Sequence, residues 1–434
     1  MTSAVPRTRS RPLSLPTRRL DYDMSVTSHT TTDLLAVNDF EGRDLLGAYH
    51  DRLATGVMRV LPKLLDRVSE RGAAGIDLWW EIFHQLPEET RASIVGGPLF
   101  SSWWSKVRAA VAARRTGELE DLLEHFGRFL CVAAIRQNTL PDQPVRLPLL
   151  GHGELRLPGH PGHFTLPGEP ATHVTVTHEG SSIRLTAGGT TSDVATAPFL
   201  AGVGEASLSF HPHVVLRHGT EVDATDPWLT RFMESQNAKS AIPGYPQRDL
   251  APFDPVDTAT RDALDRAVDL LDDVCDAFAS EFRRYIALVV PIRSNLVSTF
   301  TDTGFFGALF MSEHIAPFSD PLITAEHILH ETSHHRLTLL LEQDPVMAQA
   351  DEGLVDSPWR EDPRPMHQIL HGTFVFARIA QFHRRLADHD ERAARRYQVV
   401  LGDLRKGIDL LLARTTPTSR GERLYSEMCR IAAA

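Results

Sequence analysis

Cysteine is scarce in this sequence, and long apolar runs are absent. The three cysteines, Cys131, Cys275 and Cys429, lie far apart and form no CxxC pair. An odd number of separated cysteines argues against a disulfide framework, so we expect a reducing, cytoplasmic setting. The lack of long apolar runs excludes a membrane span. No apolar stretch follows the arginines near the N-terminus, so they do not belong to a secretory signal.

Basic residues are also fewer than acidic ones. The chain has 45 Lys and Arg against 56 Asp and Glu, a net charge of −11. Such a balance does not provide the basic surface that attracts nucleic acids or anionic membranes, so we expect neither as a partner. The hydrophobic content of 42% and the charged content of 23% are typical of a soluble globular protein. A length of 434 residues allows two or three domains.

The first half of the chain divides into three parts by composition. Residues 1–30 are rich in Arg, Ser, Thr and Pro, which predicts a disordered tail. Residues 31–140 carry apolar residues at helical spacing and predict a helical N-terminal domain, with long helices at 38–72 and 117–137. Residues 141–218 are rich in Gly, Pro, Thr and Val and predict a β-rich subdomain.

The β-rich subdomain holds many histidines and several predicted strands. We expect the strands near 145–147, 173–177, 183–186 and 214–217. The histidines show no ligand spacing that fits one regular element, so we assign them no metal: His152, His160, His163, His173, His178, His211 and His213.

The remaining residues, 219–434, form the predicted catalytic domain, which is mainly helical with a short sheet. A long amphipathic helix is expected at 257–286. Strands are expected next, at 286–291, 296–300 and 305–312. A helix with a metal-binding pattern follows them directly.

That helix contains His330-Glu331-Thr332-Ser333-His334, an H-E-x-x-H pattern. Asp320 can cap the helix at its start, Pro321 suits the first turn, and Asp344-Pro345 ends it. Residues four apart share a helical face, so His330 and His334 can direct two imidazoles at one metal ion.

The alternative is that both histidines are buried in the core and hydrogen-bonded to other protein groups, without a metal ion. Leucines surround the motif and predict that it is buried. Two buried imidazoles without partners would cost several kcal/mol, about 2–7 for each unmet polar group, so a metal site is favoured. Strands followed by such a helix are the order seen in zincin-type metalloproteases, where an edge strand can pair with an extended peptide. We therefore expect an α+β fold, mainly helical, with a zincin-like metal-binding core and a β-rich inserted subdomain.

A catalytic metal needs at least a third protein ligand. His371 is our first candidate, on an apolar helix that Pro365 opens. His367 lies one turn earlier on the same face and competes with it, and so does a carboxylate, with Glu352 or Glu361 as candidates.

The segment before this helix, residues 357–365, is stiffened by prolines and carries Arg360 and Arg364. A held arginine can bind a carboxylate with two parallel hydrogen bonds. Arg378 follows His371 by seven residues, shares its helical face, and is a further candidate. A surface ion pair is the simpler reading for each of the three.

Three stretches together carry a family resemblance. They are the H-E-T-S-H helix, S-P-W-R-x-D-P-R-P at 357–365, and L-H-G-x-F-V-F at 370–376. Over residues 296–380 the sequence resembles the H-E-x-x-H-containing peptide-modification proteins of bacterial peptide natural-product clusters. Members of that family are iron-containing, 2-oxoglutarate-dependent peptide β-hydroxylases.

The resemblance implies a ligand set and a reaction. It implies that His330, His334 and His371 hold Fe(II), that 2-oxoglutarate chelates the iron, and that an arginine pairs with its far carboxylate. Arg364 is the first choice for that arginine, then Arg378, then Arg360. The substrate would be a side chain in a ribosomally made precursor peptide. Glu331 would orient water, oxygen or a histidine.

The rival interpretation is a zinc metallopeptidase acting on a peptide. In that case Glu331 is the general base that activates a zinc-bound water, and the arginines bind a substrate carboxylate. His335 or His367 could donate the proton. A third class, a peptide-binding protein with a vestigial site, is disfavoured because both motif histidines and Glu331 are present.

Overall fold

The computed structural model describes residues 44–65, 75–151, 153–204, 208–242, 245–253, 255–315 and 317–434. It is an α+β protein, as predicted. The tail expected at residues 1–30 lies outside the described residues. In the described ranges, no helix is long and apolar enough to cross a membrane.

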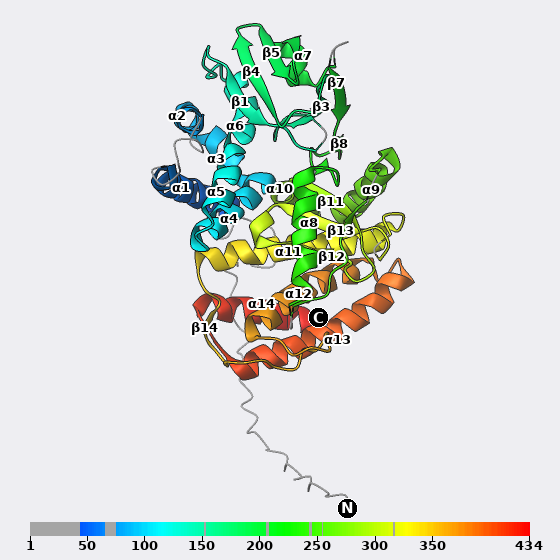
Figure 1. Ribbon diagram of the computed structural model, residues 1–434. Helices are drawn as coiled ribbons and strands as arrows, with labels where there is room; N and C mark the ends of the chain where they lie inside the picture. The colour runs from blue at the N-terminus through cyan, green and yellow to red at the C-terminus, as the bar shows by residue number, and fades with distance from the viewer. Residues whose placement is uncertain are drawn as a thin grey trace, which may run out of the picture. The chain divides into compact units, whose positions relative to one another are not determined.

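Helices make up the first part of the described chain (Figure 1): α1 (Leu45–Leu65), α2 (Ile76–Gln85), α3 (Glu88–Gly96), α4 (Pro98–Ala112), α5 (Thr116–Glu124) and α6 (Phe126–Arg136). α1 covers the middle of the helix expected at 38–72, whose ends lie outside the described residues. The single helix expected at 117–137 is wrong, because the chain breaks at His125 into α5 and α6. Since the apolar spacing continues across His125, periodicity gave no sign of this break.

Two antiparallel sheets follow. One has the order β1-β4-β5-β6: β1 (Val145–Pro148), β4 (His173–Glu179), β5 (Ser182–Ala187) and β6 (Thr190–Ala195). The other has the order β2-β3-β7: β2 (Glu154–Arg156), β3 (Gly162–Thr165) and β7 (Ser209–Pro212). A short helix, α7 (Thr196–Ala201), connects them. The turn between β4 and β5 uses Gly180 at φ 65°, a conformation that glycine adopts without strain.

A six-stranded sheet forms the centre of the fold. Its order is β12-β13-β11-β9-β8, and β10 also pairs with β11. The strands are β8 (Val214–Val215), β9 (Glu221–Val222), β10 (Ala251–Pro252), β11 (Leu288–Arg293), β12 (Thr299–Phe300) and β13 (Ala308–Ser312). β11 runs parallel to β9 and β13, and β12 is an antiparallel edge strand. The strands expected at 296–300 and 305–312 are thus shorter than predicted, with a 3₁₀ turn at Thr303–Phe305 between them.

The two faces of this sheet contact different cores. Val290 and Phe310 belong to a core shared with α1–α6, α8 (Pro227–Lys239) and both antiparallel sheets. Val289 and Leu309, which alternate with them, pack with α9 (Thr258–Val274), α10 (Asp276–Tyr285) and α11 (Pro321–Gln343). The boundary that we placed at 218/219 falls in the turn between β8 and β9.

The single helix expected at 257–286 is also wrong, because Cys275 is extended and separates α9 from α10. Asp272 and Asp273 lie at the C-terminal end of α9, where the helix dipole disfavours negative charge. Asp276 lies in the first turn of α10, where the dipole favours it. Asp276 therefore favours a helix start at this point, whereas Asp272 and Asp273 disfavour extending α9 through it.

The C-terminal part adds α12 (Met366–Leu386), α13 (Glu391–Arg414) and α14 (Ser419–Ala433), which pack against one another (Figure 1). α12 also contacts α11. A two-stranded sheet of β14 (Met347–Ala350) and β15 (Thr415–Pro417) links the ends of α11 and α13. Leu337, Leu340, Ile369 and Phe374 fill the core between α11 and α12.

An ion cluster joins α11 to α12 and α13. Glu326 accepts hydrogen bonds from His383 Nε2 at 2.7 Å and from Arg396 Nε at 3.0 Å. Burial alone would raise the pKa of Glu326, but these hydrogen bonds outweigh it and lower the pKa to about 2. A pKa below the unfolded value of about 4.3 means that the carboxylate stabilises the fold above that pH, and that this is lost as pH falls toward 2.

We therefore expect Glu326→Gln to lower the free energy of unfolding at pH 7 by on the order of 3 kcal/mol. The difference from the wild type should shrink steadily between pH 4.5 and pH 2. Urea unfolding at several pH values measures it. A difference that stays constant over this range would contradict the assignment.

Candidate metal site

The motif helix, α11, begins and ends where the sequence predicted. The side chain of Asp320 accepts hydrogen bonds from the backbone N–H groups of Leu322 at 3.1 Å and Ile323 at 3.3 Å. Pro321 occupies the first helical position, where its missing N–H is not needed. α12 begins directly after Pro365, also as predicted. Both histidine-bearing helices thus have well-defined starts.

The three predicted ligands lie together where α11 contacts α12. Nε2 of His330 is 3.2 Å from Nε2 of His334, and Nδ1 of His334 is 3.4 Å from Nδ1 of His371. The ring centroids of His334 and His371 are 5.6 Å apart, with the rings nearly parallel at 24°. His334 therefore lies between the other two, with one ring nitrogen facing each of them.

Burial keeps these imidazoles neutral. It lowers the pKa of His330 to about 4 and that of His371 to about 4, and it lowers the pKa of His334 well below the ordinary value. Nearby positive charge adds to the effect on His330 and His334, including that of Arg360. A neutral imidazole is the form that binds a metal.

This donor set fits a transition metal. Two ligands that each bind one ion at about 2.1 Å lie roughly 3 Å apart, close to the spacing of the His330 and His334 nitrogens. His371 faces the other nitrogen of His334, so binding one ion by all three requires the ring of His334 or His371 to turn. Three imidazoles suit Fe(II) and Zn(II) alike.

The histidines open onto a cavity of about 330 Å³. Its other walls come from α12 and from the proline-rich segment before it. The lining residues are His330, His334, Trp359, Arg360, Arg364, His367, Gln368, His371, Gly372 and Phe376. The competing ligand His367 thus faces the same space, but it is exposed, whereas His371 is half-buried.

Two of the three candidate arginines reach this cavity. Arg364 is paired with Asp362 and donates to Gln368 Oε1 at 2.9 Å, while its Nε is buried and has no hydrogen-bond partner among the described residues. Arg360 is exposed and makes no ion pair within the described ranges. Both guanidinium groups can therefore offer donors to a bound carboxylate.

The proposed role of the third candidate, Arg378, in binding a carboxylate must be corrected. It is fully buried, it does not line the cavity, and it is paired with Glu281 of α10. The same carboxylate accepts a hydrogen bond from Arg336 Nη1 of α11 at 2.8 Å. Arg378 lies two turns after His371 on the same face of α12, as expected. At that point, however, the face packs against α10 and not against the cavity. It is thus a structural residue that links three helices.

Glu331 is buried beside the edge strand. It accepts a hydrogen bond from Thr299 Oγ1 of β12 at 2.7 Å and does not line the histidine cavity. Burial raises the pKa of Glu331 to about 7, although hydrogen bonds from Thr299 and Thr301 lower it in part. The carboxylate is therefore next to the motif histidines in sequence but is directed toward the strand.

The other residues weighed for the site lie elsewhere. His335 is buried and accepts a hydrogen bond from the backbone N–H of Gly307 at 2.8 Å, so it has a structural role. Nδ1 of His327 lies 3.4 Å from Thr299 Oγ1, the same hydroxyl that donates to Glu331. Glu352 and Glu361 are exposed and do not line the cavity.

Sequence reasoning missed how Gly372 shapes the cavity wall. A Cβ atom at Gly372 would lie 2.2 Å from Cζ2 of Trp359, so the helix accepts the indole only because this residue has no side chain. Trp359 also packs edge-on against Phe376 at 5.0 Å between ring centroids. A glycine inside a helix, directly after the proposed ligand His371, was the signal in the sequence that another group packs closely there.

We expect Gly372→Ala to displace Trp359, to lower the free energy of unfolding by about 1–3 kcal/mol, and to weaken metal binding. Urea unfolding and a metal titration measure the two effects. Gly402→Ala in α13 is the matched control, because a Cβ there has no neighbour within 4 Å and alanine favours helix. Equal stability of the two variants would contradict this packing role.

Comparisons with protein-family models and with curated proteins find no match to this sequence.

Proposed function

We propose that this protein is an Fe(II)- and 2-oxoglutarate-dependent hydroxylase that modifies the Cβ of a side chain in a ribosomally made precursor peptide. The proposal rests on the family resemblance of residues 296–380. The observation that carries it is that three neutral imidazoles and two arginines face one cavity. At about 330 Å³, this cavity is near the lower end of the range for small-molecule sites.

Each group in the cavity has a task under this proposal. His330, His334 and His371 would hold the iron, which supplies the oxidising chemistry together with 2-oxoglutarate and O₂. Arg364, whose Nε has no hydrogen-bond partner in the part of the chain that the structure describes, would bind the far carboxylate of 2-oxoglutarate. Arg360 would add positive charge at the mouth of the cavity, where it is exposed. Trp359 and Phe376 would exclude water from the apolar side.

The precursor peptide would lie along the edge of the central sheet. β12 is an antiparallel edge strand and contacts α11, which supports the zincin-like core that we propose. An extended peptide can add to such an edge through main-chain hydrogen bonds. Thr299 of this strand holds Glu331, so the carboxylate would position the strand relative to the histidines.

A zinc metallopeptidase is the second candidate. It is favoured by the pKa of Glu331, which is near the value that suits a general base. It is disfavoured because Glu331 does not line the histidine cavity and is already bonded to Thr299. His335 was one suggested proton donor, but its Nε2 already accepts a hydrogen bond from the backbone N–H of Gly307.

The deciding experiment incubates the protein with Fe(II), 2-oxoglutarate, ascorbate and a short peptide encoded next to its gene. We expect the peptide to gain one oxygen atom in a reaction that depends on 2-oxoglutarate and yields succinate. Mass spectrometry follows the peptide. Cleaved peptide, or oxygen gain that is independent of 2-oxoglutarate, would overturn the proposal.

An arginine variant tests the co-substrate site separately. We expect Arg364→Ala to raise the KM for 2-oxoglutarate about 10- to 100-fold, because charged hydrogen bonds contribute about 1.5–3 kcal/mol. Succinate release gives the rate. Arg395→Ala is the control, since Arg395 forms only an exposed pair with Glu391 on α13. An unchanged KM in the Arg364 variant would exclude this arginine from the site.

A further inference from the structure

We propose that His213, Glu221 and Asp223 form a second site, for a structural divalent transition-metal ion, on the hairpin of β8 and β9. It is independent of the H-E-x-x-H site and of the proposed reaction. One ligand atom from each residue lies within 4.8 Å of the others. The ion would connect the central sheet to the β-rich part of the chain.

Strand pairing explains why these residues converge. Val214 pairs with Val222, and Val215 pairs with Glu221, in antiparallel register. Extending the register by one residue places His213 opposite Asp223. Side chains alternate between the faces of a strand, so His213, Glu221 and Asp223 share one face while Val222 points to the core on the other. The positions are thus fixed by the backbone.

The second observation is an unsatisfied imidazole. Nε2 of His213 is buried and has no hydrogen-bond partner among the described residues. Nδ1 lies 2.7 Å from Oε1 of Glu221; burial alone would lower the pKa of His213, but this carboxylate outweighs it and raises the pKa. A buried polar group without a partner is costly, and a metal ion bound by the imidazole and both carboxylates would satisfy it.

The charge of the cluster also suits a dication. Asp223 and Glu154 both pair with Arg156, at 3.3 Å and 2.6 Å, and Glu221 lies beside them. Three carboxylates and one guanidinium leave an excess of two negative charges, which falls to one when His213 is protonated beside Glu221, so a bound dication would replace that proton. The backbone N–H and Oγ1 of Thr225 donate to Asp223 Oδ1 at 2.7 Å, which orients that carboxylate.

A fourth ligand is available from the neighbouring sheet. His163 of β3 has a buried Nδ1 without a hydrogen-bond partner in the described ranges, and its ring centroid is 5.9 Å from that of His213. Two imidazoles with two carboxylates form a donor set for Zn²⁺, Mn²⁺ or Fe²⁺, and not for soft Cu⁺. With His163 bound, the ion would join β3 to β9.

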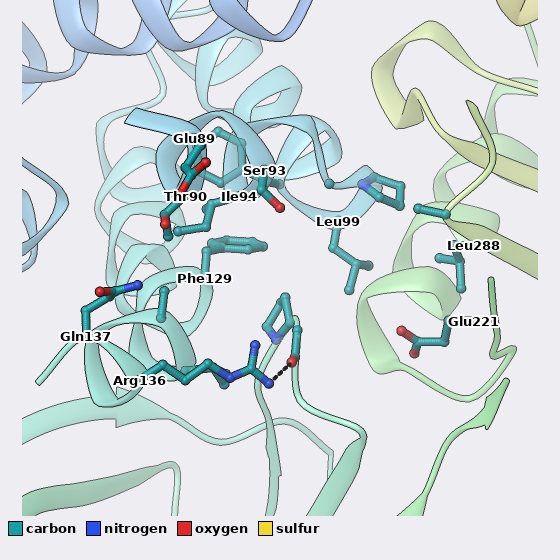
Figure 2. A pocket seen from close by; sticks show the side chains of 18 residues that line it. Glu89, Thr90, Ser93, Ile94, Leu99, Phe129, Arg136, Gln137, Glu221 and Leu288 are labelled. Carbon is teal, nitrogen blue, oxygen red and sulfur yellow. Dashed lines mark hydrogen bonds between the residues drawn. The ribbon is translucent and has the colours of Figure 1, made fainter. Parts of the chain in front are cut away.

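One ligand of the proposed site, Glu221, is open to a neighbouring cavity. Glu221 lines a cavity of about 620 Å³ whose other walls come largely from α3, α4 and α6. Figure 2 shows the Glu221 carboxylate directed into this cavity, across from Leu99 and Phe129. Water and ions can therefore reach Glu221 although His213 and Asp223 are largely buried.

The test is the metal content of the full chain after equilibration with Zn²⁺, and in parallel with Mn²⁺. We expect two bound ions in the wild type. His213→Ala and Asp223→Asn should each lose one, and the double variant His330→Ala/His334→Ala should lose the other. His218→Ala is the matched control, because His218 is exposed in the same hairpin. The experiment therefore tests the two proposed metal sites independently of each other.

A Zn²⁺ titration in the His330→Ala/His334→Ala background sharpens the result. We expect His213→Ala to weaken binding there by about 100-fold or more, since even groups that only support a ligand contribute 10- to 100-fold. Glu221→Gln, a milder change, guards against a folding defect and should weaken binding in the same direction. Unchanged affinity in both variants would show that His213 and Glu221 form only an ion pair, and would overturn the proposal.

Discussion

His371→Ala should lose the metal of the H-E-x-x-H site, and His367→Ala should keep it. Both histidines line the cavity and lie one turn apart on α12. His371 is half-buried and contacts His334 at 3.4 Å between nitrogens, whereas His367 is exposed. We expect removal of His371 to weaken metal binding by more than about 100-fold, since even the loss of a group that only hydrogen-bonds to a ligand costs 10- to 100-fold. Activity should be lost with it.

Metal content and a metal titration measure this difference. They are best made in a His213→Ala background, so that a second ion does not obscure the first. His367→Ala serves as the matched control, because it removes an imidazole from the same cavity and helix. If the His371 variant retains its metal and the His367 variant does not, the third ligand has been assigned to the wrong residue.

Glu281→Ala should cause the largest loss of stability among the single variants considered. Its carboxylate is 2% exposed and accepts hydrogen bonds from Arg336 of α11 and Arg378 of α12. Removing one partner of a buried ion pair typically costs about 3–5 kcal/mol, because a charge remains buried without its counterion. Here one substitution removes the counterion of two guanidinium groups. Urea unfolding measures the change.

Asp272→Asn is the matched control for Glu281. Asp272 of α9 pairs with Arg283 of α10 at 2.5 Å, but both side chains are partly accessible, and pairs near the surface contribute about 0–1 kcal/mol. Because Arg336 and Arg378 follow His334 and His371 on their helices, Glu281→Ala should also weaken metal binding. A variant as stable as Asp272→Asn would show that the buried carboxylate is dispensable.

Local signals in the sequence predicted the parts of the site that depend on one helix. The ends of α11 follow from Asp320, Pro321 and Asp344, and the four-residue spacing placed His330 and His334 on one face. His371 and Arg364 were proposed from the apolar helix that follows Pro365 and from the prolines of residues 357–365, and both line the cavity. These features depend on neighbours within a few turns of the chain.

Distant partners account for what could not be predicted. From the sequence, Arg378 was a reasonable candidate to bind a carboxylate ligand. In the structure it pairs with Glu281, which lies 97 residues earlier in the chain. The histidines of the β-rich part had no visible ligand spacing, because His213 meets Asp223 only through the register of a hairpin. The breaks at His125 and Cys275 interrupt stripes whose periodicity continues across them.

One apolar core runs beneath the N-terminal helices, both antiparallel sheets and one face of the central sheet. A fragment that starts after residue 218 would lose the N-terminal helices and antiparallel sheets from this core, and the apolar surface left exposed would favour aggregation over folding alone. The histidine-bearing helices therefore cannot be excised as an independently folding unit. Shortening this protein for engineering must begin at surface turns such as that at Gly180, where the backbone reverses without contributing to the interior.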